Sequence, residues 1–167
     1  MNISTLKKRL KEALIWIIII TVASNVISYL RKPSLSSDML PSIKMAMIDG
    51  RIFDSKMVEG KPLILHFWGV WCPVCKMEAS NIQTLSEKYT VITIAVNSES
   101  NEEIREYMQK NGLDFDVIND EEGNLAKRFN VEVFPTTFIY DGKGKLRFSE
   151  TGYTTTAGLL SRMAIVK

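Results

Sequence analysis

Cysteine and histidine are the scarcest chemically reactive residues in this 167-residue chain, which has two cysteines and one histidine. Two cysteines are too few for a disulfide framework and too few for a zinc site of four thiolates. They are Cys72 and Cys75, three positions apart, so a bond between them would close a loop too short to constrain the unfolded chain much. Redox chemistry therefore explains the pair better than a structural crosslink.

A basic surplus is also absent from most of the chain. The first 32 residues hold six of the 21 Lys and Arg residues and only one of the 19 acids, so residues 33–167 carry a formal net charge of −3. Nucleic-acid-binding domains need a clustered basic face, and this body has none. We expect no nucleic-acid partner, and the residue pattern points to no bound cofactor and no metal site.

Only one long apolar run occurs, Ala13–Leu30, with 18 residues and no charge. As a helix it would span roughly 27 Å, close to the hydrocarbon core of a bilayer at about 30 Å. Basic residues flank it, four before and two after: Lys7, Lys8, Arg9, Lys11, Arg31 and Lys32. This bias favours a cytoplasmic N-terminus. We predict that residues 1–32 form a cytoplasmic tip and one transmembrane helix, with the rest of the chain outside.

A cleaved signal peptide is the alternative for the same segment. Small residues are present at Ala23 and Ser24, but the apolar run continues beyond them and no A-x-A cleavage pattern follows. An uncleaved anchor is therefore the preferred interpretation. We expect a polar linker over residues 33–41 and one folded domain over residues 42–167.

The folded part alternates between the hydrophobic patterns of strands and helices. Strands are predicted within 43–53, where two short strands flank the Asp49-Gly50 turn, and at 63–68, 91–96, 115–118, 136–140 and 145–148. Helices are predicted from Pro73 to about Lys88 and at 101–111, 124–129 and 154–165. This order indicates an α/β fold with a central mixed sheet and helices on both faces.

The cysteine pair lies where a buried strand gives way to a helix. The apolar run Leu63–Trp68 ends at Gly69, and Pro73 between the cysteines suits the first turn of a helix. Unpaired backbone N–H groups at a helix start favour a thiolate on Cys72, while Cys75 lies one turn deeper. We assign Cys72 as the nucleophile and Cys75 as the resolving thiol. An inert pair or half of a metal site fits this junction less well.

The segment FWGVWCPVCKME, residues 67–78, resembles the active-site segment of thioredoxin-like proteins, in particular the exported, anchored TlpA, ResA and DsbE branch. The resemblance covers about residues 40–167. The Cys-Pro-Val-Cys sequence and the short anchor look most like the suppressor-for-copper-sensitivity D group. The resemblance implies a three-layer thioredoxin-like fold and protein disulfide oxidoreductase activity. It also implies a cis bond before Pro135, with Phe134, Pro135 and Thr136 meeting the substrate.

Three further residues become candidates through this resemblance. His66 replaces a buried acid of thioredoxins and could accept a proton beside Cys75, or it could be a hydrogen-bonded core histidine without a catalytic part. Glu78 matches an acid that tunes the thiol pKa values in ResA-like members, or it could be an exposed helix glutamate. Trp71 is expected to shape the rim of the site.

The combined prediction is a single-pass protein of the bacterial inner membrane whose domain exchanges electrons with periplasmic protein thiols or disulfides. The resemblance favours a reductant, recharged by a transmembrane electron-donor protein, in cytochrome c maturation or thiol protection under copper stress. A Cu(I) metallochaperone of the same fold is the alternative, since two thiolates can hold Cu(I). Dedicated carriers of this fold add a histidine downstream, however, and this chain has none beyond His66. An assembly protein with an incidental disulfide is the third possibility.

Overall fold

The computed structural model describes residues 37–166 without a gap, together with residues 9, 11, 12, 14–16, 18, 19, 22, 33 and 35. The chain divides into two compact units, Met1–Lys32 and Pro33–Lys167. The described residues of the first unit are helical. The predicted membrane span Ala13–Leu30 lies mostly outside the described residues, and no helix within the described residues is long and apolar enough to cross a membrane.

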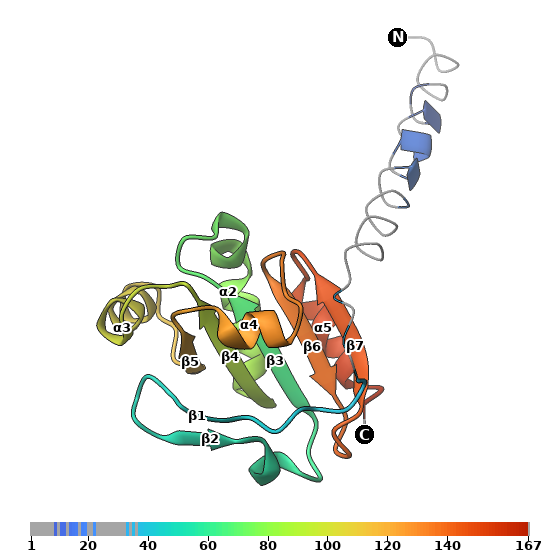
Figure 1. Cartoon of the computed structure of the whole chain (residues 1–167). Helices are drawn as coiled ribbons and strands as arrows, with labels where there is room; N and C mark the ends of the chain where they lie inside the picture. Colours follow the sequence, from blue (N-terminus) through green and yellow to red (C-terminus); the bar gives the residue numbers. More distant parts are fainter. Residues whose placement is uncertain are drawn as a thin grey trace. The chain divides into compact units, whose positions relative to one another are not determined.

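The second unit is built on a five-stranded sheet in the order β5-β4-β3-β6-β7 (Figure 1). The central strand β3 (Leu63–Trp68) runs parallel to β4 (Thr90–Val96), which runs parallel to β5 (Asp116–Asp120). On its other side β3 pairs antiparallel with β6 (Thr136–Tyr140), and β6 pairs antiparallel with β7 (Leu146–Thr151). The predicted mixed sheet is confirmed.

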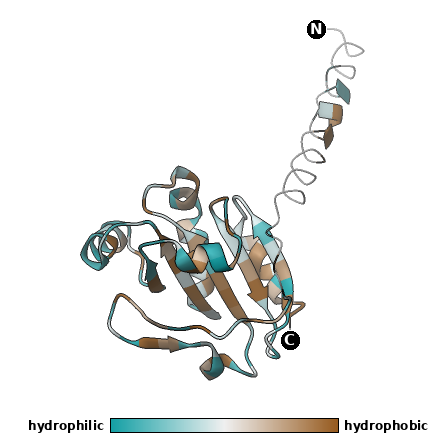
Figure 2. Ribbon diagram, in the orientation of Figure 1, coloured by the Kyte–Doolittle hydropathy of each residue, from teal (hydrophilic) through white to brown (hydrophobic). Residues whose placement is uncertain are grey.

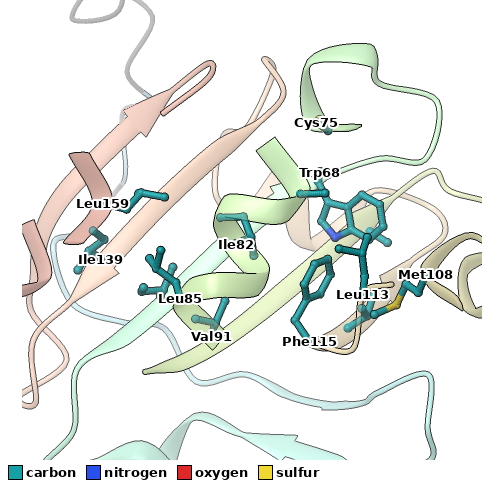
Figure 3. Close-up of a cluster of buried hydrophobic side chains, with 14 of the residues drawn as sticks. Trp68, Cys75, Ile82, Leu85, Val91, Met108, Leu113, Phe115, Ile139 and Leu159 are labelled. Carbon is teal, nitrogen blue, oxygen red and sulfur yellow. The ribbon is translucent and has the colours of Figure 1, made fainter. Parts of the chain in front are cut away.

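Helices cover both faces of this sheet, as predicted. One face carries α2 (Pro73–Ser86), α3 (Asn101–Lys110) and α5 (Thr156–Met163), which bury Ile82, Ile104 and Leu159 in a single core cluster. Figure 3 shows the part of this cluster beneath α2. The other face carries the short helix α4 (Asn124–Arg128), whose Leu125 belongs to a second cluster. The central strands are the most hydrophobic elements, while α3 and α4 present hydrophilic residues (Figure 2).

A hairpin of β1 (Lys44–Ala46) and β2 (Ile52–Asp54) precedes this sheet. The hairpin is a separate two-stranded sheet, and the residues after β1 meet β5: Met47 forms an isolated bridge with Ile118, and the Ile48 amide donates a hydrogen bond of 2.9 Å to the Val117 carbonyl. A 3₁₀ helix, η1 (Ser55–Val58), follows and was not predicted; the Asp54 carboxylate caps it by accepting from the Lys56 amide at 3.0 Å. The segment after β1 thus covers part of the edge of β5.

The predicted linker 33–41 is in part built into the domain. The Leu40 amide donates to the Gly144 carbonyl at 2.7 Å, and the Leu146 amide donates to the Asp38 carbonyl at 2.6 Å. Leu35 and Leu40 also pack against the second core cluster. Backbone groups at and just before the start of β7 would otherwise lack hydrogen-bond partners, and residues 38–40 supply them. The folded domain therefore begins before residue 42.

Candidate active site

Cys72 and Cys75 form a disulfide at the start of α2, with their Cα atoms 5.3 Å apart. Cys72 is the N-cap residue, and its sulfur accepts a hydrogen bond from the Cys75 amide at 3.2 Å. Both residues are buried, and Cys75 lies close to Trp68 at the edge of the core cluster (Figure 3). The Cys72 sulfur is thus held at the helix N-terminus, where N–H groups and the helix dipole favour negative charge.

A second segment, residues 133–136, lies next to the turn that carries Cys72. The Phe134–Pro135 peptide bond is cis in the structure. The ring of Phe134 meets the indole of Trp71 edge to face, with centroids 5.3 Å apart. The side chain of Thr136 is 1% exposed and donates to the Val133 carbonyl at 2.7 Å, so this hydroxyl is not presented to solvent.

Trp71 is half exposed yet held in place. Its indole N–H donates to the carbonyl of Val96, at the end of β4, over 3.0 Å. With the Phe134 contact, this hydrogen bond fixes the ring beside Cys72. Trp71 therefore stands beside Cys72 with polar support from β4.

His66 lies in the middle of β3 on the face that α2 covers, since Ile64 and Trp68 on the same side of the strand belong to the α2 cluster. It is buried, and its Nδ1 lies 2.9 Å from the hydroxyl of Thr137 on β6. Burial lowers the pKa of His66 from its usual 6.5 to about 3. The imidazole is therefore neutral at neutral pH and already has a hydrogen-bonding partner.

Glu78 is completely buried on α2, so the alternative of an exposed helix glutamate is wrong. Its Oε1 accepts a hydrogen bond from the Thr154 amide at 3.1 Å, while Oε2 has no hydrogen-bond partner among the described residues. Burial raises the pKa of Glu78 from 4.5 to about 7, against the smaller opposing effect of the Thr154 hydrogen bond. Near neutral pH this carboxyl is therefore about half protonated.

Asn81, one turn after Glu78, was missed by sequence reasoning. Its amide nitrogen donates to the Thr154 carbonyl at 3.0 Å, so α2 side chains hold both peptide groups of Thr154. The same loop reaches the cis-proline, because the Gly152 amide donates to the Pro135 carbonyl at 2.8 Å. Glu78 is thus connected to Pro135 through residues 152–154, a contact that no local pattern in the sequence could reveal.

In the described part of the chain, no group of three or more His, Cys, Asp or Glu side chains is placed to hold a metal ion. A cavity of about 550 Å³ is lined by Gly60, Leu63 and Gly142. Leu63 begins β3 whereas Cys72 follows its end, so this cavity is remote from the disulfide.

A cysteine pair at the N-terminus of a helix, following the central strand of a mixed five-stranded sheet, defines a thiol–disulfide oxidoreductase of thioredoxin-like fold. A model of the AhpC/TSA family matches residues 37–149. A thioredoxin-like protein of Haemophilus influenzae is 30% identical over 160 residues, 95% of each chain. The chain belongs to the AhpC/TSA family, among relatives of the ResA and DsbE type.

Two further relatives support this assignment. The thiol-disulfide oxidoreductase ResA of Geobacillus thermodenitrificans is 27% identical over 131 residues, 76% of this chain and 75% of its own. A secreted Mycobacterium tuberculosis disulfide oxidoreductase homologous to DsbE has a TM-score of 0.66 at 27% identity, covering 75% of this chain and 96% of its own. The resemblance inferred from the FWGVWCPVCKME segment is confirmed at the level of this branch.

The buried Glu78 predicts a stability that falls with rising pH. A carboxyl whose pKa is raised from 4.5 to about 7 on folding contributes stability that is complete below pH 4.5 and lost as the pH rises through 7. Glu78→Gln cannot ionise and keeps an acceptor for the Thr154 amide. We expect the variant to be more stable than the wild type at pH 8, by on the order of 1–3 kcal/mol, with a much smaller advantage at pH 5.

The measurement is urea unfolding of the oxidised protein at both pH values, since the unfolding midpoint and slope give the free energy. Glu87→Gln, at the exposed C-cap of the same helix, is the matched control and should change neither value. If Glu78→Gln and the wild type keep the same free-energy difference at pH 5 and pH 8, the carboxyl does not titrate in this range.

The buried His66 predicts the opposite pH dependence. A histidine whose pKa falls from 6.5 to about 3 on folding contributes stability that is present above pH 6.5 and lost as the pH falls toward 3. His66→Asn removes the titration while its side-chain amide can still bond Thr137. Its unfolding free energy should therefore fall less than that of the wild type between pH 7 and pH 4, by about 1–3 kcal/mol. Parallel curves would show that His66 remains protonatable in the fold.

Proposed function

We propose that this protein is a membrane-anchored oxidoreductase outside the cytoplasm that exchanges electrons with cysteines of other proteins. The observation that carries the proposal is the Cys72 sulfur at the N-cap of α2, where it accepts the Cys75 amide hydrogen bond. A sulfur in this position is stabilised as a thiolate, which is the attacking form in thiol–disulfide exchange. The names of the ResA and DsbE-type relatives support the same chemistry.

The proposed reaction has two steps. In the reduced protein, the Cys72 thiolate attacks a substrate disulfide, forms a mixed disulfide and expels one substrate thiolate. The Cys75 thiolate then attacks the Cys72 sulfur, closes the Cys72–Cys75 disulfide and releases the second substrate thiolate. Two electrons pass from the protein to the substrate, and each released thiolate takes a proton. The Cys72–Cys75 disulfide in the structure corresponds to the product of the second reaction step.

Protons for these steps have two candidate carriers, Glu78 and His66. Glu78 lies one turn after Cys75, and its pKa of about 7 lets it gain or lose a proton near neutral pH. His66 is neutral and lies under α2, where it can accept a hydrogen bond more readily than a proton. We propose that Glu78 exchanges the proton and that His66 orients groups beneath the helix.

The substrate is proposed to bind across the rim formed by Trp71, Phe134 and Pro135. Trp71 is 51% exposed, and Phe134 lies against it, so both offer apolar surface beside the sulfur. The Thr136 hydroxyl points inward and its strand pairs with both β3 and β7, which limits its part to holding the strand. Pro135 is buried as well, so within this rim recognition falls to the side chains of Trp71 and Phe134.

Anchoring and direction of electron flow complete the proposal. The apolar run Ala13–Leu30 and its flanking basic residues support an anchor with the domain in the periplasm. An oxidising compartment keeps a redox-active cysteine pair oxidised, so a reductant there needs electrons from the cytoplasm through a transmembrane donor. We propose this reductant role, in cytochrome c maturation or in protecting protein thiols under copper stress.

The exchange mechanism predicts different fates for the two cysteine variants. Cys75→Ser leaves the attacking thiol but removes the resolving one, so mixed disulfides with partner proteins should accumulate. Cys72→Ser should trap far fewer partners, since Cys75 is more deeply buried, at 1% exposed. The measurement is a non-reducing gel of membranes from cells that express each variant, repeated after reduction.

The same gel separates the redox enzyme from a Cu(I) carrier. A two-thiolate copper site predicts that both variants lose metal equally and that neither traps a partner. Reducible high-mass bands specific to Cys75→Ser support the exchange mechanism. Equal trapping by both variants would contradict the assigned roles, and no trapping by either would contradict the enzyme.

The anchor predicts where a reporter becomes active. A reporter enzyme that works only after export should be active and sediment with membranes when fused after Lys167. The matched control is the same reporter fused after Glu12, before the apolar run, which should stay inactive. A soluble exported product of reduced mass would show that the segment is a cleaved signal instead.

A further inference from the structure

Ser98 is a fully buried serine just beyond the end of β4, outside every motif that points to redox chemistry. Its hydroxyl accepts a hydrogen bond from the Val70 amide at 3.1 Å and donates to the Val96 carbonyl at 3.0 Å. Val70 belongs to the turn between β3 and α2. Ser98 therefore ties the turn that leads to Cys72 to a neighbouring strand, 28 residues along the chain.

The same carbonyl also holds the neighbouring aromatic ring. The Trp71 indole N–H donates to the Val96 carbonyl at 3.0 Å, so Ser98 and Trp71 share one acceptor. Gly69 gives the indole the room it needs, because a Cβ at position 69 would lie 2.6 Å from the indole nitrogen. Only glycine leaves room for the ring where it stands. The Ser98–Val70 and Trp71–Val96 hydrogen bonds thus hold Val70 and Trp71 in place.

These two residues are the centre of the turn that ends at the nucleophile. The Cys72 amide donates to the Gly69 carbonyl at 3.0 Å, which closes the turn. With both of its central residues pinned, the turn has little freedom, and the Cys72 sulfur is set against the N-terminus of α2. Movement of Val70 would displace Cys72 directly, because only Trp71 separates them.

The loop around Ser98 is itself held in an uncommon conformation. Its flanking residues Asn97 and Glu99 have φ angles of 46° and 71°, in the left-handed region that non-glycine residues rarely adopt. Such conformations persist where the surrounding structure fixes them, and they cluster at functional sites. Here they bracket Ser98, whose hydroxyl reaches the active-site turn.

We propose that Ser98 is a positioning residue for Cys72, which acts through the Val70–Trp71 turn. Its hydroxyl holds the turn so that the Cys72 sulfur meets the backbone N–H groups of α2 and the indole stands against Phe134. This inference rests on the proposed exchange function. Ser98 acts through Val70, and no sequence motif marks it.

The test is Ser98→Ala in the full chain, purified in a mild detergent. With the Val70 amide released, the Cys72 thiolate should lose part of its stabilisation. We expect alkylation of the reduced protein by iodoacetamide at pH 6 to slow by about 3- to 10-fold, the effect of one lost hydrogen bond. The equilibrium with a glutathione redox buffer should shift by a similar factor toward the protein disulfide.

Ser149→Ala is the matched control, because Ser149 is also buried but its hydroxyl has no hydrogen-bond partner in the described part of the chain. It should change neither measurement. Gly69→Ala is a second test variant, because its added Cβ would crowd the Trp71 indole and displace it. It should shift the pH profile of alkylation in the same direction as Ser98→Ala.

Thermal unfolding of each variant separates positioning from general loss of stability. Ser98→Ala with wild-type alkylation and redox equilibrium, whatever its melting temperature, would overturn the proposal. Equal shifts in Ser98→Ala and Ser149→Ala would overturn it too. Absence of exchange activity in the wild type would instead contradict the proposed function, so the two failures are distinguishable.

Discussion

A turn of four residues, Gly69–Cys72, joins two elements that the core holds rigidly, and the redox chemistry depends on where this turn leaves one sulfur. β3 is buried along its whole length and paired on both sides, so its end cannot move. α2 is fixed by Ile82 and Leu85, which are fully buried against the sheet. The position of the Cys72 sulfur is therefore set by core packing rather than by a mobile surface loop, as preorganised chemistry requires.

His66 on β3 and Glu78 on α2 are the buried titratable groups near the cysteine pair, and neither is well suited to stabilise a Cys72 thiolate by its charge. Burial lowers the pKa of His66 to about 3 and raises the pKa of Glu78 to about 7, so neither brings a full charge at neutral pH. The Cys72 sulfur already accepts a hydrogen bond from one helix N–H group, that of Cys75, and such groups favour negative charge there. Glu78 can then take up or release a proton without first breaking an ion pair.

The sequence was most informative where a signal is local. The run Leu63–Trp68 is bounded by Pro62 and Gly69, and its predicted ends match β3. The prediction for β6 also matches at both ends, and the other predicted strands and helices are present with ends that agree or differ by one to three residues, because fraying and capping depend on neighbours. The cysteine pair at the start of α2 followed from the same local pattern, since Pro73 marks the first turn of the helix.

Contacts between distant segments were invisible in the sequence. In the sequence Glu78 looks like an ordinary helix glutamate, and the Thr154 amide that bonds its carboxylate lies 76 residues away. Ser98 looks like an ordinary loop serine until β4 places it beside Val70. The docking of residues 38–40 likewise depends on free backbone groups at the start of β7. Chemistry carried by a motif could be predicted, whereas the residues that position it could not.

The two ends of β3 serve different parts of the proposed function. Leu63, at its start, pairs with Tyr140 beside the hairpin on which Asp38–Leu40 docks, and Cys72 follows its other end. Six strand residues span about 20 Å. The segment through which the chain joins the domain and the site that exchanges electrons thus lie at opposite ends of one strand. A partner protein can therefore reach Cys72, Trp71 and Phe134 without competing for the surface that holds Asp38–Leu40.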